Sequence, residues 1–191
     1  MAAPSALTLA AFCGSTRRGS LNRRLLHATV ERCLNAGASV DVIDLGEVDL
    51  PLFNQDLEKE RGIPADVAPI QARLDVVDGV LIASPEYNGG YTPLFKNTLD
   101  WISRIDHLTF YPRYVGLMTA TPGGKGGARG LAQMEQLFHN VFVHVHEPSF
   151  GLGNAHEELD GGRPVAGLTE WTEEYLEAAV EFAKAPPEKP R

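Results

Sequence analysis

Cysteine is scarce in this sequence: a chain of 191 residues has two, Cys13 and Cys33. Their separation matches no paired spacing of a redox or zinc motif, and both lie in segments where apolar residues recur regularly. Disulfide frameworks and cysteine-bound metal centres are therefore excluded. We expect two buried free thiols in a reducing compartment, and hence a cytoplasmic protein.

Long apolar runs are lacking as well, because no stretch approaches the roughly 18 residues that a membrane-spanning helix needs. The opening residues, MAAPSA, have no basic group followed by a long apolar segment, so no secretory signal is expected. Positive charge is in deficit: 17 Lys and Arg stand against 25 Asp and Glu, for a net charge of −8. Nucleic acids and membrane surfaces select a broad basic face. We therefore expect neither of them as a partner.

One short segment departs from this acidic average. Residues 12–24 read FCGSTRRGSLNRR and contain four arginines and no acidic residue. They follow an apolar run at 7–12, typical of a buried strand, and lead into apolar residues at helical spacing: Leu21, Leu25, Leu26, Val30 and Leu34. A small-residue loop between a strand and a helix offers free backbone N–H groups and the positive end of the helix dipole to an anion. The segment predicts a phosphate site with contacts from Ser15, Arg17, Ser20, the Leu21 backbone and Asn22.

The loop lacks both common nucleotide motifs. Gly14 and Gly19 have the spacing of a P-loop, but Ser20 stands where the phosphate-gripping lysine belongs, and no G-x-G-x-x-G occurs. A site for one terminal phosphomonoester, without Mg²⁺, fits the residues better. This loop alone leaves open the alternative that it is a Ser/Gly turn which merely connects a strand to a helix.

Strand-like and helix-like segments alternate five times along the chain. Strands are expected at residues 7–12, 39–45, 79–84, 114–120 and 141–146. Helices are expected from residue 21 to about 36, at 64–77 and 94–105, after 130 through 139, and at 168–184. The alternation requires right-handed crossovers and so a parallel sheet between helices, an α/β fold. With no repeat or linker, residues 1–191 are expected to form one domain, with a frayed tail over 185–191.

Three loops with unusual compositions follow strands, so they meet at the carboxyl edge of the sheet, where such folds bind ligands. We call residues 13–22 the first loop, 84–93 the second and 120–130 the third. The second loop carries Pro85, Glu86, Tyr87 and Asn88, a flat polar and aromatic set suited to the edge of a heterocycle, and the third has five glycines between 123 and 130, which allow close backbone approach. A phosphate at one end and a flat polar ring at the other describe flavin mononucleotide, FMN.

The same loops resemble those of the NADPH-dependent FMN reductase family, a flavodoxin-like group that includes quinone, chromate and azo-dye reductases. The resemblance rests on three segments: GSTRRGSLN at 14–22, SPEYN at 84–88 with Leu94, Lys96, Asn97, Asp100 and Trp101, and the Gly-rich stretch 123–129. It covers roughly residues 7–183 in the expected order. It implies a flavodoxin-like three-layer sandwich whose five parallel strands have the order 2-1-3-4-5.

The resemblance also implies a site and an assembly. Non-covalent FMN would contact Ser15, Arg17, Ser20, Leu21 and Asn22 with its phosphate and Pro85, Glu86, Tyr87 and Asn88 with its ring, and Thr121 would lie near the other ring edge. A homodimer or homotetramer is implied, with the helix after Pro93 near the subunit interface. Two features depart from common versions of the pattern: Gly89-Gly90-Tyr91-Thr92 in the second loop and Lys125 in the third. Both bear on the choice of acceptor and nicotinamide.

The function that these features predict is an FMN-dependent NAD(P)H oxidoreductase. Hydride would pass from NADPH or NADH through FMN to a small acceptor such as a quinone, azo dye, chromate or free flavin. One shared site and no second nucleotide motif indicate ping-pong kinetics. The flavin supplies the chemistry, so we expect no catalytic side chain. The alternative is a flavodoxin-type electron carrier without a small-molecule substrate of its own.

Two further segments permit two interpretations each. Residues 48–63 form an irregular stretch that is either a flap over the site or a solvated connector. His144 and His146 share one face of an expected strand, and one interpretation of them is a metal-binding pair. Their alternation with valines favours a half-buried edge strand, and no third ligand is evident, so no metal site is predicted.

Overall fold

The computed structural model describes residues 7–161 and 164–188. Its sheet has the strand order β2-β1-β3-β4-β5, and every strand pair is parallel. The strands are β1 (Thr8–Cys13), β2 (Ser39–Ile43), β3 (Gly79–Ala83), β4 (Tyr114–Ala120), β5 (His144–Val145) and β6 (Phe150–Leu152). The predicted order 2-1-3-4-5 is thus confirmed, and this is the flavodoxin-like order.

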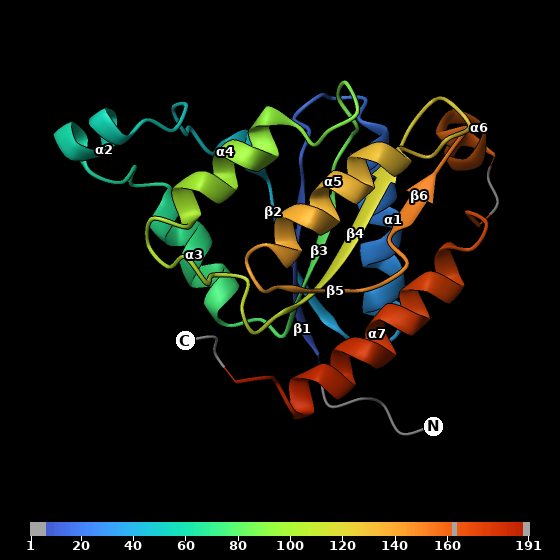
Figure 1. The fold of residues 1–191 in the computed structure, drawn as a ribbon. Coiled ribbons are helices and arrows are strands. Elements are labelled where there is room, and N and C mark those ends of the chain that lie inside the picture. The colour runs from blue at the N-terminus through green and yellow to red at the C-terminus, as the bar shows by residue number, and fades with distance from the viewer. Residues whose placement is uncertain (1–6, 162–163, 189–191) are drawn as a thin grey trace.

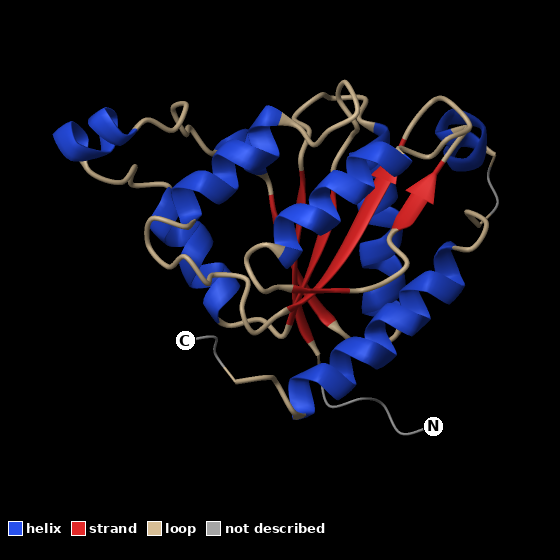
Figure 2. Ribbon diagram, in the orientation of Figure 1, coloured by secondary structure: helices blue, strands red, loops and turns tan. Residues whose placement is uncertain are grey.

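Helices cover both faces of the sheet (Figures 1 and 2). They are α1 (Leu21–Asn35), α2 (Gln55–Arg61), α3 (Val67–Asp75), α4 (Pro93–Ile102), α5 (Ala128–His139), α6 (Ala155–Asp160) and α7 (Leu168–Lys184), with a 3₁₀ turn at Leu45–Glu47. Side chains of α1 and α7 pack on one face of the sheet, and those of α3, α4 and α5 pack on the other. Successive β1 residues alternate between these two cores, as the pleat of a strand buried on both faces requires.

The prediction of one strand over 141–146 is correct only for His144–Val145. Residues 141–143 form a turn in which Phe142 has a φ of 60°, and β5 pairs only with the start of β4. A further strand, β6, pairs with the end of β4, so two short strands share the edge that one was expected to fill. Pro148 lies between them and has no N–H to offer a ladder.

Several helix boundaries also differ from expectation. Helix α3 begins at Val67 rather than at residue 64, and α4 ends at Ile102. Helix α5 begins at Ala128, before the expected end of the third loop at residue 130. Gly126 and Gly127 have positive φ, so the irregular backbone ends at these two residues and the helix follows directly. Sequence periodicity missed α2 and α6, which have seven and six residues and are shorter than two helical turns.

The C-terminal tail falls partly outside the described residues, which end at 188. Glu188 does contact the body of the protein, since its carbonyl accepts a hydrogen bond from the Tyr111 hydroxyl. Fraying over 185–191 therefore stays a prediction. No helix within 7–161 or 164–188 is long and apolar enough to cross a membrane.

His146 is buried between β4 and α7. Its Nδ1 lies 3.2 Å from the Tyr114 hydroxyl, and its ring meets Trp171 and Tyr175 at centroid distances of 5.3 and 5.7 Å. Its Nε2 has no hydrogen-bond partner among the described residues. Burial lowers the pKa of His146, and the charge of Glu174 opposes this without reversing it. A protonated ring would leave a buried N–H unpaired, so the native site favours the neutral form.

We expect this histidine to make the protein less stable in acid. Because its pKa is lower in the folded state, the unfolded chain binds the proton first as pH falls below about 6.5. The free energy of unfolding should then decrease, by at most about 1.4 kcal/mol per pH unit for one proton, until the folded pKa is reached. Urea denaturation from pH 7.5 to 5.5 measures this slope, and His146→Phe should have a shallower one. Equal slopes in both proteins would contradict the assignment.

Candidate functional site

A cavity of about 160 Å³ opens at the carboxyl edge of the sheet, where the three loops meet. It is lined by Ser15, Arg17, Ser20, Leu21, Asn22, Pro85, Glu86, Tyr87, Ala120, Thr121 and Pro122. Nine of the ten side chains predicted from the sequence are in this set; the exception is Asn88. Residues more than 100 positions apart are therefore brought to one place by the parallel topology.

The first loop ends in the N-terminus of α1. The Ser20 side chain caps this helix by accepting a hydrogen bond from Arg23 N at 3.3 Å. Ser15 and Ser20 are buried, whereas Arg17 extends from the cavity wall into solvent. The backbone N–H groups of Leu21 and Asn22 have no acceptor among the described residues. These donors, the two hydroxyls and one guanidinium suit a phosphate group, which accepts several hydrogen bonds.

The Asn22 side chain is engaged elsewhere. Its Nδ2 donates to the Ala120 carbonyl at 2.8 Å, and its Oδ1 accepts from the Ala120 N–H at 2.9 Å. The residue is 2% exposed, so its Oδ1 and one of its Nδ2–H groups are committed to Ala120 inside the protein. Its backbone N–H has no acceptor among the described residues and is free for a ligand.

The second loop turns sharply after the cavity wall. Tyr87 and Gly90 exchange two backbone hydrogen bonds of 2.9 and 3.0 Å, and Asn88 and Gly89 form the tip with positive φ. Asn88, at the tip of this turn, is not among the residues that line the cavity. The Asn-Gly pair is a known signal for such turns, so the sequence contained the information. The Tyr87 ring is half exposed at the mouth.

The Glu86 carboxylate faces α5 rather than solvent. It accepts hydrogen bonds from Gly130 N at 3.0 Å and from Arg129 Nη2 at 3.1 Å. The Gly130 N–H, followed by the Arg129 guanidinium, lowers the pKa of Glu86, which therefore stays ionised. Its backbone lines the cavity while its side chain holds the second loop against the third.

The third loop is supported by the elements that the sequence analysis missed. Thr121 N donates to Leu152 O of β6 at 2.9 Å, and the Thr121 hydroxyl donates to Gly123 O at 2.9 Å. Gly126 lies against β6 so closely that a Cβ there would be 2.8 Å from Gly151 O. Lys125 is exposed at the apex of this fixed loop. Ala120 and Pro122, which also line the cavity, were not predicted.

The remaining arginines of the first segment do not line the cavity. Arg23 pairs with Asp44 at 3.3 Å and Arg24 with Asp160 at 2.7 Å, while Arg18 is exposed. Arg17 is the one of the four arginines of this segment that lines the cavity.

Residues 48–63 lie beside α4 and not over the cavity. Asn97 accepts from Phe53 N at 2.8 Å and donates to the Pro51 carbonyl at 3.0 Å, and Trp101 Nε1 donates to the same carbonyl at 2.7 Å. Helix α2 projects from this anchored stretch, away from the sheet (Figure 1). None of its residues lines the cavity, so the structure favours the connector interpretation over the flap.

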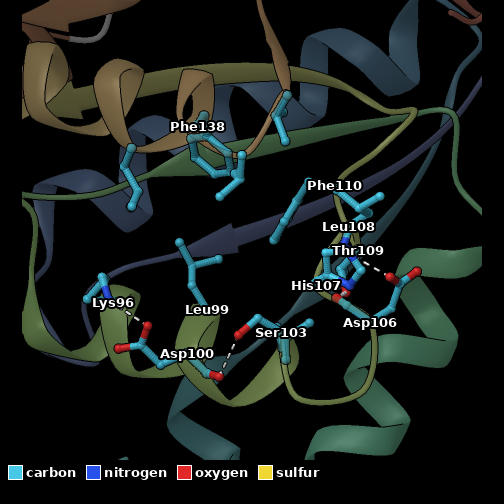
Figure 3. Close-up of a pocket in the computed structure, with 14 residues that line it drawn as sticks. Lys96, Leu99, Asp100, Ser103, Asp106, His107, Leu108, Thr109, Phe110 and Phe138 are labelled. Atoms are coloured by element: carbon cyan, nitrogen blue, oxygen red, sulfur yellow. Dashed lines mark hydrogen bonds and ion pairs between the residues drawn. The ribbon is translucent and has the colours of Figure 1, made fainter. Parts of the chain in front are cut away.

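A second cavity, of about 250 Å³, lies between α4, the segment after it and the end of α5. Figure 3 shows Leu99, Phe110 and Phe138 around it, with the Lys96–Asp100 ion pair at one side. It contains none of the predicted site residues. Within the described parts of the chain, no group of three or more His, Cys, Asp or Glu residues is placed to hold a metal ion.

Comparison with known proteins gives one consistent result. The family model described as NADPH-dependent FMN reductase matches residues 7–157. An NAD(P)H:quinone oxidoreductase of Solanum tuberosum is 35% identical over 157 residues, covering 80% of this chain and 78% of that protein. A quinone reductase of Escherichia coli (strain K12) is 32% identical over 157 residues, covering 81% of each.

A solved structure agrees with these sequence relatives. FerB, a flavoenzyme NAD(P)H:(acceptor) oxidoreductase from Paracoccus denitrificans, superposes with a TM-score of 0.65 at 25% identity, covering 88% of this chain and 98% of that one. The matched segment 7–157 contains all three loops that form the cavity. The chain therefore belongs to the NADPH-dependent FMN reductase family.

Proposed function

We propose that this FMN-dependent NAD(P)H reductase binds FMN in the 160 Å³ cavity and uses it to reduce quinones. The observation that carries the proposal is the meeting of a phosphate-type loop and a ring-type loop in one cavity. The named quinone reductases among its relatives support the acceptor. Azo dyes, chromate and free flavin are alternative acceptors, since an exposed flavin discriminates little among small oxidants.

The phosphate would be held at the α1 end of the cavity. The unpaired N–H groups of Leu21 and Asn22, the hydroxyls of Ser15 and Ser20, and the Arg17 guanidinium supply its hydrogen bonds. A phosphomonoester accepts several hydrogen bonds and carries negative charge, which this set of donors can satisfy. The positive end of the α1 dipole adds to the attraction.

The ring would be held between the second and third loops. Backbone atoms of Pro85, Glu86 and Tyr87 face it from one side and Thr121 from the other, while Asn88, which does not line the cavity, takes no part. When bound, FMN accepts a hydride from the nicotinamide and passes electrons to the acceptor. The protein's part is to fix the ring edge and to leave one face open. Because the three loops meet around this cavity, donor and acceptor would use it in turn, in a ping-pong sequence.

Mixing the purified FMN-bound protein with NADPH in the absence of oxygen tests the activity. We expect the visible flavin band to bleach rapidly and to return when a quinone is added. The second candidate, an electron carrier of flavodoxin type, would bleach only with a separate reductase present. A protein that binds no FMN would refute both candidates.

We also propose a homodimer or homotetramer whose interface includes α4. The cavity of Figure 3 is lined in part by α4. Val141 lines it as well, Ile105 and Phe142 are next to lining residues in the chain, and all three are exposed apolar side chains. Sedimentation velocity decides the point, and a monomer at micromolar concentration would contradict it.

The compartment we propose is the cytoplasm. Cys13 and Cys33 are both buried and unpaired in the structure, which suits a reducing environment. Burial raises the pKa of both thiols, that of Cys33 to about 12, so neither is a reactive thiolate at neutral pH.

A further inference from the structure

Three polar side chains each cross from one cavity loop to the backbone of another. The first is Asn22 of the first loop, which forms both of its amide hydrogen bonds with Ala120 at the start of the third. The pair imitates the two bonds that a neighbouring strand would make. It fixes the first turn of α1, where the phosphate donors lie, to the residue before Thr121.

The second crossing side chain is Thr92, at the end of the second loop. Its hydroxyl donates to the Gly14 carbonyl of the first loop at 2.8 Å and accepts from Phe95 N at 3.2 Å, so it also caps α4. It is 1% exposed. The contact is close-packed, since a Cβ on Gly14 would lie 3.0 Å from the Thr92 hydroxyl.

The third is Glu86, which ties the second loop to the third through Gly130 N and the Arg129 guanidinium. Gly130 permits this approach, because a Cβ there would lie 3.0 Å from the Glu86 Cβ. With this bond the connections form a closed ring: first loop to third, third to second, and second back to first. No loop can move alone without breaking a buried hydrogen bond.

We propose that Asn22, Thr92 and Glu86 are positioning residues that lock the three loops into one preformed FMN site, and that the Asn22 side chain acts through this ring and does not bind the phosphate. The inference rests on the proposed FMN site. It predicts that removing one of these hydrogen bonds near the phosphate also weakens binding of the flavin ring. A direct phosphate ligand would have no such effect.

Two flavins separate these roles. Riboflavin has the ring of FMN but no phosphate. Loss of a side chain that binds the phosphate therefore weakens FMN binding and leaves riboflavin binding unchanged. Loss of a hydrogen bond between two loops displaces the second and third loops, which contact the ring. It therefore weakens the binding of both FMN and riboflavin. Apoprotein would be titrated with each flavin by fluorescence quenching, and the visible circular dichroism of bound FMN would report the ring environment.

We expect Asn22→Ala and Thr92→Val each to raise both dissociation constants about tenfold and to change the visible dichroism. Thr92→Ser, which keeps the hydroxyl, should restore wild-type values. Thr29→Ala and Thr98→Val are matched controls, because neither hydroxyl bonds to a cavity loop: they donate to carbonyls of their own helices at 3.0 and 2.8 Å, and Thr29 also contacts the Met118 sulfur of β4 at 3.5 Å. Both controls should bind both flavins normally.

An effect of Asn22→Ala on FMN alone would overturn the proposal and make Asn22 a phosphate ligand. Unchanged binding of both flavins by folded Thr92→Val would overturn it as well. If Asn22→Ala does not fold, Thr92→Val and Thr92→Ser carry the test, because valine preserves the shape of threonine. A wild-type protein that binds neither flavin would instead refute the proposed function.

Discussion

Gly14→Ala is expected to raise the dissociation constant for FMN about ten- to a hundredfold. The added methyl group would lie 2.5 Å from the Ser84 Oγ and 2.9 Å from the Ser84 Cβ. The hydroxyl can rotate away, but the Cβ cannot, because Gly14 N is bonded to Ala83 O at 2.8 Å and Ser84 N to Met118 O at 3.0 Å. The first and second loops must therefore separate. Overpacking of this kind costs about 1–3 kcal/mol, and here the cost falls on the cavity wall.

Gly123→Ala is the matched control for this substitution. Gly123 belongs to the third loop, but no atom lies within 4 Å of the position its Cβ would take, and its φ is not positive. It should bind FMN as the wild type does. Fluorescence titration of both apoproteins makes the comparison, and thermal unfolding checks that both are folded. Wild-type affinity in Gly14→Ala would show that the two loops are not in the close contact seen here.

The order of the sheet and the meeting of the three loops at one edge could be predicted because both follow from periodicity and from one topological rule. The bounds of β4 and α7 match the sequence expectation, since each is a long segment with one clear period. Strands that alternate with helices become parallel, and their carboxyl ends then meet at one edge. Three loops far apart in the chain were assigned to one site on that ground alone.

Short elements and long-range hydrogen bonds could not be predicted in the same way. Strand β6 has three residues, one of them glycine, which is too few to show alternation. Asn22 is a common type of phosphate contact, and nothing near it in sequence indicates that its amide pairs with Ala120, 98 positions away. Glu86 likewise finds its partners 43 and 44 positions away. The composition of a loop predicts that it contacts a ligand, whereas the role of each side chain depends on neighbours that only the fold supplies.

Arg17→Ala is expected to raise the dissociation constant for FMN about ten- to a hundredfold while leaving that for riboflavin unchanged. Arg17 is the one arginine of the first segment that lines the cavity, and no ion pair engages it among the described residues. Its guanidinium is therefore available to a phosphate, and a hydrogen bond to a charged group contributes about 1.5–3 kcal/mol. The loss should shrink at high salt, because Arg17 is exposed and screened.

Arg18→Ala removes the same charge one position away. It therefore distinguishes a direct contact between Arg17 and the phosphate from a general electrostatic attraction by the basic segment. Arg18 is exposed but does not line the cavity. If the net positive charge of the segment were what binds FMN, both variants would lose FMN affinity to the same extent. We expect Arg18→Ala to change the dissociation constant less than twofold, since charges exposed to water interact weakly over distance. Unchanged FMN affinity in Arg17→Ala would place the phosphate elsewhere. Equal losses of FMN and riboflavin would make Arg17 part of the loop structure, because a phosphate ligand has nothing to bind in riboflavin.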